Sequence, residues 1–245
     1  MSEAGLPMGF YEKQLYIPFR DCDASGRVSL RSWLSYLAEL AGDQYEQRDL
    51  GRDQLLSQNQ VFLVSSFSLH FLRHPRAYET LTASTWEKGL DAVFFRRNYD
   101  FYDQSGLCAA EASSLWLLCD PVRHRILRPS ALGHEVPDID RPIDCPFPEK
   151  IQPFSGGEEL GRHTVRYSDL DVNLHIYCAN YGSIIMDYLP GDVREKPFER
   201  FTLNYVKEAT LGETISLKGL KDNSSYTVTG THENGGLCFA ARMSF

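Results

Sequence analysis

The chain has 245 residues, of which 42% are hydrophobic and 24% charged, and its formal net charge is −8. This composition is typical of globular proteins, and the negative charge with scattered arginines argues against nucleic acid as the main partner. No apolar run reaches the ~18–20 residues of a membrane span, His and Cys show no metal-ligand spacing, and six cysteines without a CxxC pair indicate free thiols in the cytosol.

The first part of the chain predicts a strand, a helix and four further strands. The first strand covers 14–19. Apolar residues at helical spacing follow Ser29, a good N-cap, and predict a helix that ends near Tyr45. Segments rich in β-branched and aromatic residues, separated by turn clusters, then predict antiparallel strands. These strands cover 61–72, 80–87, 92–102 and 107–118.

A proline-rich stretch separates this part from a second part with the same order. It predicts a linker that crosses the surface. After it come a strand over 163–167 and a helix over 176–189, which Pro190 and Gly191 stop. Strands follow at 201–207, 214–220, 226–231 and 237–243. We therefore divide the chain into an N-terminal domain (1–125), a linker (126–160) and a C-terminal domain (161–245).

The two domains align with each other, which indicates an internal duplication. The segment that starts at Phe67 aligns with the one that starts at Phe201, an offset of 134 residues (201 − 67), and Glu79 meets Glu213 at the same offset. Matching blocks in the same order are unlikely to arise by chance, so we expect two similar folding units.

The aligned domains differ at one polar set. The second domain has Asp171, Asn173 and His175, where the first has Asp23, Ser25 and Arg27, an offset of 148 (171 − 23). Glu208 of the second domain corresponds to His74 of the first, by the offset of 134 (208 − 74). This asymmetry predicts that the second domain carries the chemistry and that the first shapes the pocket.

The polar set lies between a predicted strand and a predicted helix. Asp171, Asn173 and His175 alternate, so in an extended segment all three face one cleft. The helix predicted from Ile176 offers unpaired N–H groups, which suit an oxyanion. Each residue alone also has an ordinary explanation, because Asp and Asn commonly cap helices, a lone His is often structural, and Glu208 fits a solvated strand end.

A long helix wrapped by an antiparallel sheet, used twice, resembles the α+β double hotdog fold. The stretch Ser168 to His175 and the later stretch Leu203 to Glu208 resemble the acyl-ACP thioesterase family, the plant-type enzymes and their bacterial relatives. The resemblance covers nearly the whole chain. It implies a cytoplasmic hydrolase of fatty acid biosynthesis, without a cofactor, that cleaves fatty acyl-[acyl-carrier-protein] to free fatty acid and holo-ACP.

The resemblance also implies roles for single residues. Asp171, Asn173 and His175 fall on catalytic positions of the family motif, and Glu208 falls on its catalytic glutamate. A carboxylate would act as general base or as nucleophile, His175 would assist proton transfer, and Asn173 would orient water. Ala209 stands where some relatives carry a cysteine, so no thiol nucleophile is available there.

The segment after His175 departs from the family: the family usually has Val-Asn-Asn there and a basic residue just before the later tyrosine, whereas this chain has Ile176, Tyr177 and Cys178, and then Asn180 before Tyr181. Tyr177 and Cys178 stand where the family usually has two asparagines, which affects substrate fit and leaves the polar triplet unchanged. We expect the thiol of Cys178 to be buried and inert.

Two further surfaces follow from the resemblance. We expect an acyl pocket in the first domain, lined by Trp33, Tyr36, Leu37 and Phe67. The acidic carrier requires a locally basic dock, for which Arg20, Arg27, Arg96, Arg97 and Lys207 are candidates. A tandem unit already pairs two hotdogs, so the expected assembly is a monomer or a homodimer.

Three alternatives remain open at this point. An acyl-CoA thioesterase shares the fold and differs in the carrier. A dehydratase acting on a 3-hydroxyacyl thioester uses a His and a carboxylate, and fits the order of this motif poorly. A non-catalytic module would bind acyl thioesters without turning them over.

Overall fold

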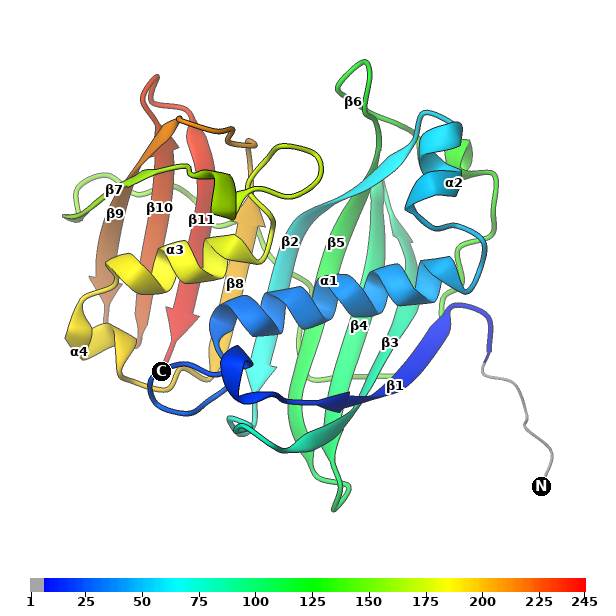
Figure 1. Ribbon diagram of the computed structural model, residues 1–245, viewed down its shortest axis with the longest axis horizontal. Coiled ribbons are helices and arrows are strands. Elements are labelled where there is room, and N and C mark those ends of the chain that lie inside the picture. The colour runs from blue at the N-terminus through cyan, green and yellow to red at the C-terminus, as the bar shows by residue number, and fades with distance from the viewer. Residues whose placement is uncertain (1–6) are drawn as a thin grey trace.

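The computed structural model describes residues 7–245, which form one continuous antiparallel sheet of 11 strands with its two main helices on one face (Figure 1). The first half of the chain supplies β1 (Phe10–Tyr16), β2 (Val61–Phe71), β3 (Thr80–Asp91), β4 (Phe94–Asp103), β5 (Cys108–Asp120) and β6 (Arg125–Ile126). The second half supplies β7 (Glu158–Thr164), β8 (Arg200–Tyr205), β9 (Thr214–Asp222), β10 (Ser225–His232) and β11 (Leu237–Ser244). The predicted strands after each long helix are present. The predicted strands 14–19 and 163–167 are misplaced, because β1 ends at Tyr16 and β7 at Thr164, and the chain then turns into short helices at Phe19–Asp21 and Tyr167–Asp169.

The sheet is built symmetrically about β2 and β8. Its strand order is β1-β3-β4-β5-β2-β8-β11-β10-β9-β7, and β6 pairs with β5 off this path. Outward from the central pair, the first half runs β2, β5, β4, β3, β1 and the second half runs β8, β11, β10, β9, β7, so equivalent strands occupy equivalent places. Ser68 lies opposite Thr202, its own equivalent in the alignment of the two halves, with 3.5 Å between the hydroxyl oxygens. A pseudo-twofold axis passes between these residues, and the predicted α+β tandem architecture is confirmed.

The long helix of the first half is α1 (Leu30–Glu46). The Ser29 hydroxyl accepts a hydrogen bond from the backbone N–H of Ser32, so the predicted N-cap is confirmed. Its buried face carries Leu34, Leu37 and Leu40, which are all fully buried against the sheet. The amphipathic pattern thus positions α1 across β2 to β5 (Figure 1).

The helix of the second half, α3 (Asn180–Tyr188), is shorter and starts four residues later than the sequence predicts. The reason is that the backbone N–H groups of Ile176 and Tyr177 bond to the carbonyls of Ala209 and Asp169. These bonds tie the segment before α3 to the loop after β8 and to Asp169, and leave it outside the helix. The predicted helix start at residue 176 is therefore wrong.

Short helices connect the larger elements. They are η1 (Phe19–Asp21), α2 (Arg52–Ser57), η2 (Pro129–Leu132), η3 (Tyr167–Asp169) and α4 (Gly191–Arg194). The sequence did not predict α2 or α4, because neither is long enough to show a helical period. Within residues 7–245, none of the helices combines the length and the hydropathy that crossing a bilayer requires.

The proline-rich segment crosses the face of the sheet opposite α1 (Figure 1). The backbone N–H of Ile139 donates to the carbonyl of Glu87 on β3, and that of Ile151 donates to the Asn204 side chain on β8. The segment therefore bridges the two halves from behind. Its predicted end at residue 160 differs from the structure, in which β7 begins at Glu158.

Candidate active site

The motif Asp171 to His175 forms a tight turn between η3 and α3, at the end of the sheet where the two halves meet (Figure 1). The backbone N–H of Asp171 donates to the His175 carbonyl at 2.9 Å, and that of Leu174 donates to the Asp171 carbonyl at 3.1 Å. The Asp171 carboxylate accepts from the N–H of Asn173 at 2.8 Å, the geometry of an Asx turn. The expectation of an extended segment is wrong, because this carboxylate folds the chain back on itself.

His175 and Glu208 come together across this turn. The Nε2 atom of His175 lies 3.2 Å from Oε2 of Glu208, and the two side chains are 29% and 47% exposed. A hydrogen bond from the N–H of Ile176 to the carbonyl of Ala209 holds the two segments in register. An imidazole beside a carboxylate and open to water has the chemical groups that general acid–base catalysis uses.

Asn173 joins the turn to the first half of the chain. Its amide Nδ2 donates to the Asp171 carboxylate at 3.3 Å, and its Oδ1 accepts from Nη2 of Arg52 at 3.1 Å. Arg52 is the first residue of α2, so the site is composite. Arg52 carries no signal in the sequence, because no local pattern connects residues 121 positions apart.

The four predicted catalytic residues thus form two pairs. Among the hydrogen bonds and ion pairs of residues 7–245, none joins the Asp171 carboxylate to the side chain of His175 or Glu208. The side chains of His175 and Glu208 lie together and are partly exposed to solvent, and Asp171 and Asn173 are hydrogen-bonded to each other within the turn; the catalytic role of all four stays a prediction. In the same range, no three His, Cys or carboxylate side chains gather in an arrangement that would hold a metal ion.

The residues after the motif contact α1. The Tyr177 hydroxyl lies 3.3 Å from the Ser35 hydroxyl and donates to Glu39 at 3.4 Å. Burial first, and the charge of Asp171 second, raise the pKa of Cys178 to about 12. The thiol is therefore protonated at neutral pH and is no nucleophile.

The oxyanion hole expected from the N-terminus of the second helix is absent at Ile176 and Tyr177. Both backbone N–H groups already donate to carbonyls, as described above. The polar groups that the structure does bring to the turn are the Asn173 amide and the Arg52 guanidinium.

The predicted acyl-pocket residues lie in the first half of the core. Leu37 and Phe67 are fully buried, and Trp33 is 1% exposed and lines a pocket beside Arg27. Tyr36 donates its hydroxyl to the Asp21 carboxylate at 2.7 Å. Their contact with an acyl chain stays a prediction.

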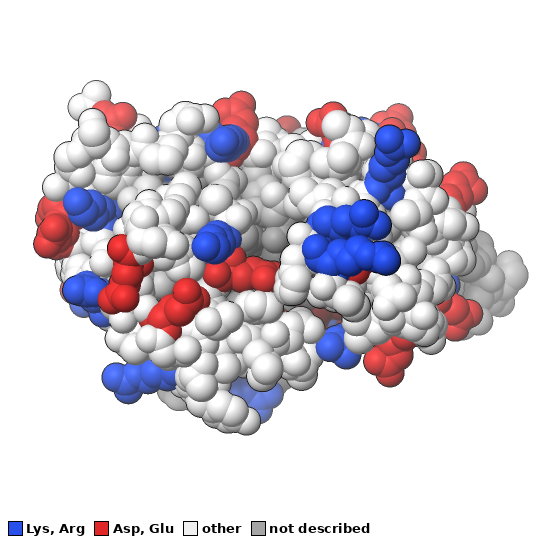
Figure 2. Space-filling view, turned by 90° about the horizontal axis from the view of Figure 1, so that it is seen from above, with Lys and Arg blue, Asp and Glu red and all other residues white. Residues whose placement is uncertain are grey.

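The basic candidates for carrier docking fall in different places. Arg97 is 2% exposed and donates to Gln44 and Thr85 inside the first half, so it is no surface residue and that prediction is wrong. Arg20 is 87% exposed, and Lys207 is exposed directly before Glu208. Figure 2 looks onto the end of the molecule that carries the turn, and shows Lys and Arg side chains on both sides of a hollow with Asp and Glu at its edge.

Comparisons with known families and proteins agree on one group. Residues 9–131 match the model of the acyl-ACP thioesterase N-terminal domain, and residues 157–236 match that of the C-terminal domain. The chain is 22% identical over 201 residues to palmitoyl-acyl carrier protein thioesterase, chloroplastic, of Cuphea hookeriana. The match covers 76% of this chain and 48% of that protein, so the chain spans about half the length of the curated relatives it matches.

Solved structures show the same fold at low sequence identity. An acyl-ACP thioesterase from Bacteroides thetaiotaomicron superposes with a TM-score of 0.85 at 21% identity, over 96% of this chain and 97% of that one. A 12:0-ACP thioesterase from Umbellularia californica superposes with a TM-score of 0.80 at 18% identity, over 98% of both chains.

Proposed function

The chain belongs to the acyl-ACP thioesterase family, as its motif led us to expect, and we propose that it hydrolyses the thioester of fatty acyl-[acyl-carrier-protein]. The products are a free fatty acid and holo-ACP, so the reaction ends chain elongation in fatty acid biosynthesis. The observation that carries this proposal is the solvent-facing contact of 3.2 Å between His175 and Glu208 at the family motif.

In the mechanism we propose, His175 activates a water molecule. With Nε2 protonated and facing Glu208, the Nδ1 lone pair accepts a proton from water as its oxygen attacks the thioester carbon. Glu208 orients the ring and stabilises the imidazolium, as a carboxylate does in other His-dependent hydrolases. When the C–S bond breaks, the imidazolium returns the proton to the leaving thiolate.

Asn173 and Arg52 supply the complementary charge in this proposal. The Asn173 amide uses one N–H for Asp171 and has a second N–H to offer the thioester oxygen, and Arg52 polarises that amide from its oxygen side. Removing one donor to an oxyanion in known enzymes costs about 2.7–4 kcal/mol of transition-state stabilisation. Asp171 holds the turn in shape.

We propose that the two halves divide the work. The second domain (161–245) carries His175 and Glu208, and the first (1–125) contributes Arg52 and the acyl pocket. Because Tyr177 contacts α1 at Ser35 and Glu39, a chain that enters from the turn meets α1 first. The acidic carrier would dock near Lys207 and Arg52, in the cytosol, on a monomer or a homodimer.

The experiment that tests this function is a thiol-release assay across acyl chain lengths, run in parallel on acyl-ACP and acyl-CoA. The proposal expects release from acyl-ACP that Glu208→Gln abolishes. Release from acyl-CoA alone would assign the chain to the other carrier. Tight binding of acyl thioester without release would make it a non-catalytic binding module.

Arg52 gives a test that is specific to this structure. Arg52→Gln should lower kcat about tenfold, because a charged hydrogen bond to the reactive turn is worth roughly 1.5–3 kcal/mol, and Arg52→Lys should restore part of it. Arg128→Gln, the same change at an exposed arginine of the first half, is the matched control. If Arg52→Gln raises KM with kcat unchanged, Arg52 binds the carrier and does not position Asn173.

A further inference from the structure

Two central strands of the first half extend beyond their counterparts in the second half. β5 has 13 residues and β2 has 11, whereas the equivalent strands β11 and β8 have 8 and 6. The pairing of β8 with β2 ends where Asn204 lies opposite Ser66. Beyond that point, residues 61–64 of β2 pair with 116–119 of β5. The two strands therefore form a ribbon that continues past the end of β8 (Figure 1).

This ribbon ends beside the candidate active site. Glu208 lies in the loop that directly follows β8. Burial first, and the charge of Glu208 second, raise the pKa of Cys119 near the end of β5. Because exposed charges are largely screened beyond about 10 Å, Glu208 lies close to the ribbon. Figure 1 shows β6, which follows β5, at the same end of the molecule as the turn before α3.

The hairpin that β5 and β6 form at this end, residues 120–126, is basic. The side chains of Arg123 and Arg125 are 69% and 61% exposed. Both guanidinium groups approach one oxygen of Asp120, at 3.2 and 3.9 Å, and neither has another carboxylate partner within residues 7–245. Two cations thus share one anion, so the hairpin carries an excess positive charge on a chain of net charge −8.

The fold of the hairpin does not depend on these guanidinium groups. The Asp120 carboxylate accepts the backbone N–H groups of Val122 and Arg123 at 3.0 and 2.9 Å, which closes the turn. The same turn leaves apolar side chains exposed, since Val122 is 72% and Ile126 53% exposed. The hairpin therefore presents a positive surface with apolar side chains on a backbone that is held independently of them.

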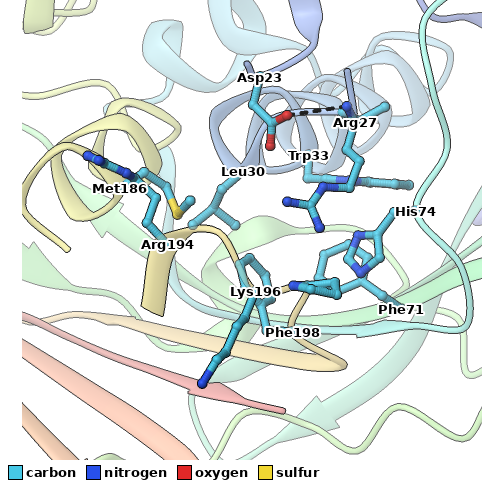
Figure 3. Close-up of a pocket in the computed structure, with 12 residues that line it drawn as sticks. Asp23, Arg27, Leu30, Trp33, Phe71, His74, Met186, Arg194, Lys196 and Phe198 are labelled. Carbon is cyan, nitrogen blue, oxygen red and sulfur yellow. Dashed lines mark hydrogen bonds between the residues drawn. The ribbon is translucent and has the colours of Figure 1, made fainter. Parts of the chain in front are cut away.

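The corresponding turn of the first half offers no comparable surface. Its pocket encloses about 20 Å³, which is room for about one water molecule. Figure 3 shows Asp23 beside Arg27, whose backbone N–H donates to that carboxylate at 3.2 Å. The Arg27 guanidinium donates to the Ser25 hydroxyl at 2.5 Å and to the Glu195 carbonyl at 3.5 Å. Groups of the protein itself thus engage Arg27, which leaves the hairpin as the better site for an acidic partner.

We propose that the β5–β6 hairpin docks the acidic acyl carrier, with its two arginines binding carboxylates and Val122 and Ile126 packing against apolar side chains of the carrier. Charge complementarity carries this assignment, and the assignment rests on the hydrolysis of acyl-ACP proposed above. A carrier seated there would lie over the end of the ribbon, from which its acyl-bearing arm would reach His175 and Glu208.

Binding of the carrier without its prosthetic arm tests the surface directly. In a titration of the full chain with fluorescently labelled apo-ACP, Arg123→Gln/Arg125→Gln should raise Kd at least about fivefold, because two exposed ion pairs are lost. The Kd of this variant should also rise less steeply with salt than that of wild type. Thermal unfolding verifies that the variant is folded.

A control variant removes the same number of positive charges elsewhere. Arg162→Gln/Arg194→Gln changes two exposed arginines of the second half, on β7 and α4. β7 lies six strands from β5, roughly 30 Å along the sheet. The Kd for apo-ACP should therefore stay within about twofold of wild type. An equal rise in both double variants would overturn the proposal, because only the net charge would then matter.

Kinetics separates docking from the reaction. In Arg123→Gln/Arg125→Gln, KM for acyl-ACP should rise at least about fivefold while kcat stays within about twofold, and kcat/KM for acyl-pantetheine, which lacks the carrier protein, should be unchanged. Equal losses on both substrates would overturn the proposal, because the hairpin would then act on the reaction itself.

The apolar contribution is tested by Val122→Ser, which should weaken binding of apo-ACP without changing its salt dependence. Leu72→Ser, at an exposed apolar residue that follows the other end of β2, is the matched control. If Val122→Ser binds as tightly as wild type, the apolar part of the proposal is wrong. Wild type that binds apo-ACP and cleaves no acyl-ACP would overturn the proposed hydrolysis and leave the docking surface standing. Cleavage of acyl-ACP that no hairpin variant affects would overturn the docking surface alone.

Discussion

The turn before α1 and the turn before α3 share a backbone and differ in what their side chains can do. In the first, the N–H of Asp23 donates to the Arg27 carbonyl at 2.7 Å; in the second, the N–H of Asp171 donates to the His175 carbonyl at 2.9 Å. Both aspartates also close an Asx turn with the residue two positions on. The shared aspartate is thus a structural feature of the repeat, and what distinguishes the halves chemically is the pair His175 and Glu208.

The largest effect on activity should come from removing His175, which distinguishes the second turn from the first. We expect His175→Ala to lower turnover of acyl-ACP by at least about 10²-fold, because a general acid–base group contributes 10²–10⁴-fold. Arg27→Ala, the same change at the equivalent position, should leave turnover within about twofold of wild type, because the first turn has no part in the reaction. Steady-state kinetics on both variants measures the contrast. Equal losses in the two would mean that the turns matter only for folding.

The two helices differ at their glycines, which gives the next largest effect. A Cβ on Gly182 of α3 would lie 2.8 Å from the backbone nitrogen of Arg31 on α1, whereas Gly42 of α1 has nothing within 4 Å. Gly182→Ala should therefore destabilise the protein by roughly 1–3 kcal/mol through overpacking.

The same substitution in α1 is the matched control. Gly42→Ala should stabilise the protein by up to about 1 kcal/mol through helix propensity. Urea unfolding of both variants measures this. A stabilising Gly182→Ala would mean that α1 and α3 do not pack this closely.

Local sequence patterns predicted most of the fold because the strands and α1 are long and strongly patterned. Predicted strands such as 61–72 and 107–118 agree with β2 and β5 to within two residues at each end. The start of α3 was misplaced because Ile176 and Tyr177 donate to carbonyls on other segments. Such tertiary bonds leave no periodic signal in the sequence.

The candidate site was predictable only in part, for the same reason. The motif and the duplication together indicated His175 and Glu208, and the structure places them in contact. Arg52 lies in a short helix of the other half, and its bond to Asn173 depends on how the halves assemble. The alternation of Asp171, Asn173 and His175 was misinterpreted as an extended segment because an Asx turn shows the same spacing.

Backbone strain also distinguishes the two turns, and its expected effect on stability is smaller. Leu174 has a φ of +64°, and its equivalent Gly26 has a φ of +76°. A left-handed conformation costs a residue with a Cβ about 1 kcal/mol. Leu174→Gly should therefore stabilise the second turn by up to about 1 kcal/mol, and Gly26→Ala should destabilise the first by a similar amount. Thermal unfolding measures both, and a destabilised Leu174→Gly would mean that the exposed leucine makes contacts that outweigh the strain.

The smallest effect should come from His74, the counterpart of Glu208. Burial first, and the charge of Arg27 second, lower the pKa of His74 below its ordinary value. The unfolded chain, in which a histidine titrates near about 6.5, then binds more protons than the folded one. Stability should consequently fall as the pH drops through this value and level off below the pKa of the folded state.

His74→Gln removes this contribution while keeping a polar side chain, so its stability should fall less than that of wild type between pH 8 and about 5.5. Chemical unfolding across this pH range measures the difference. His232→Gln, at a buried histidine of the second half, controls for the loss of an imidazole as such. If wild type and His74→Gln lose stability in parallel, the His74 imidazole titrates in the folded protein as it does in the unfolded chain. Arg27 alone would then account for the difference in charge between the two turns.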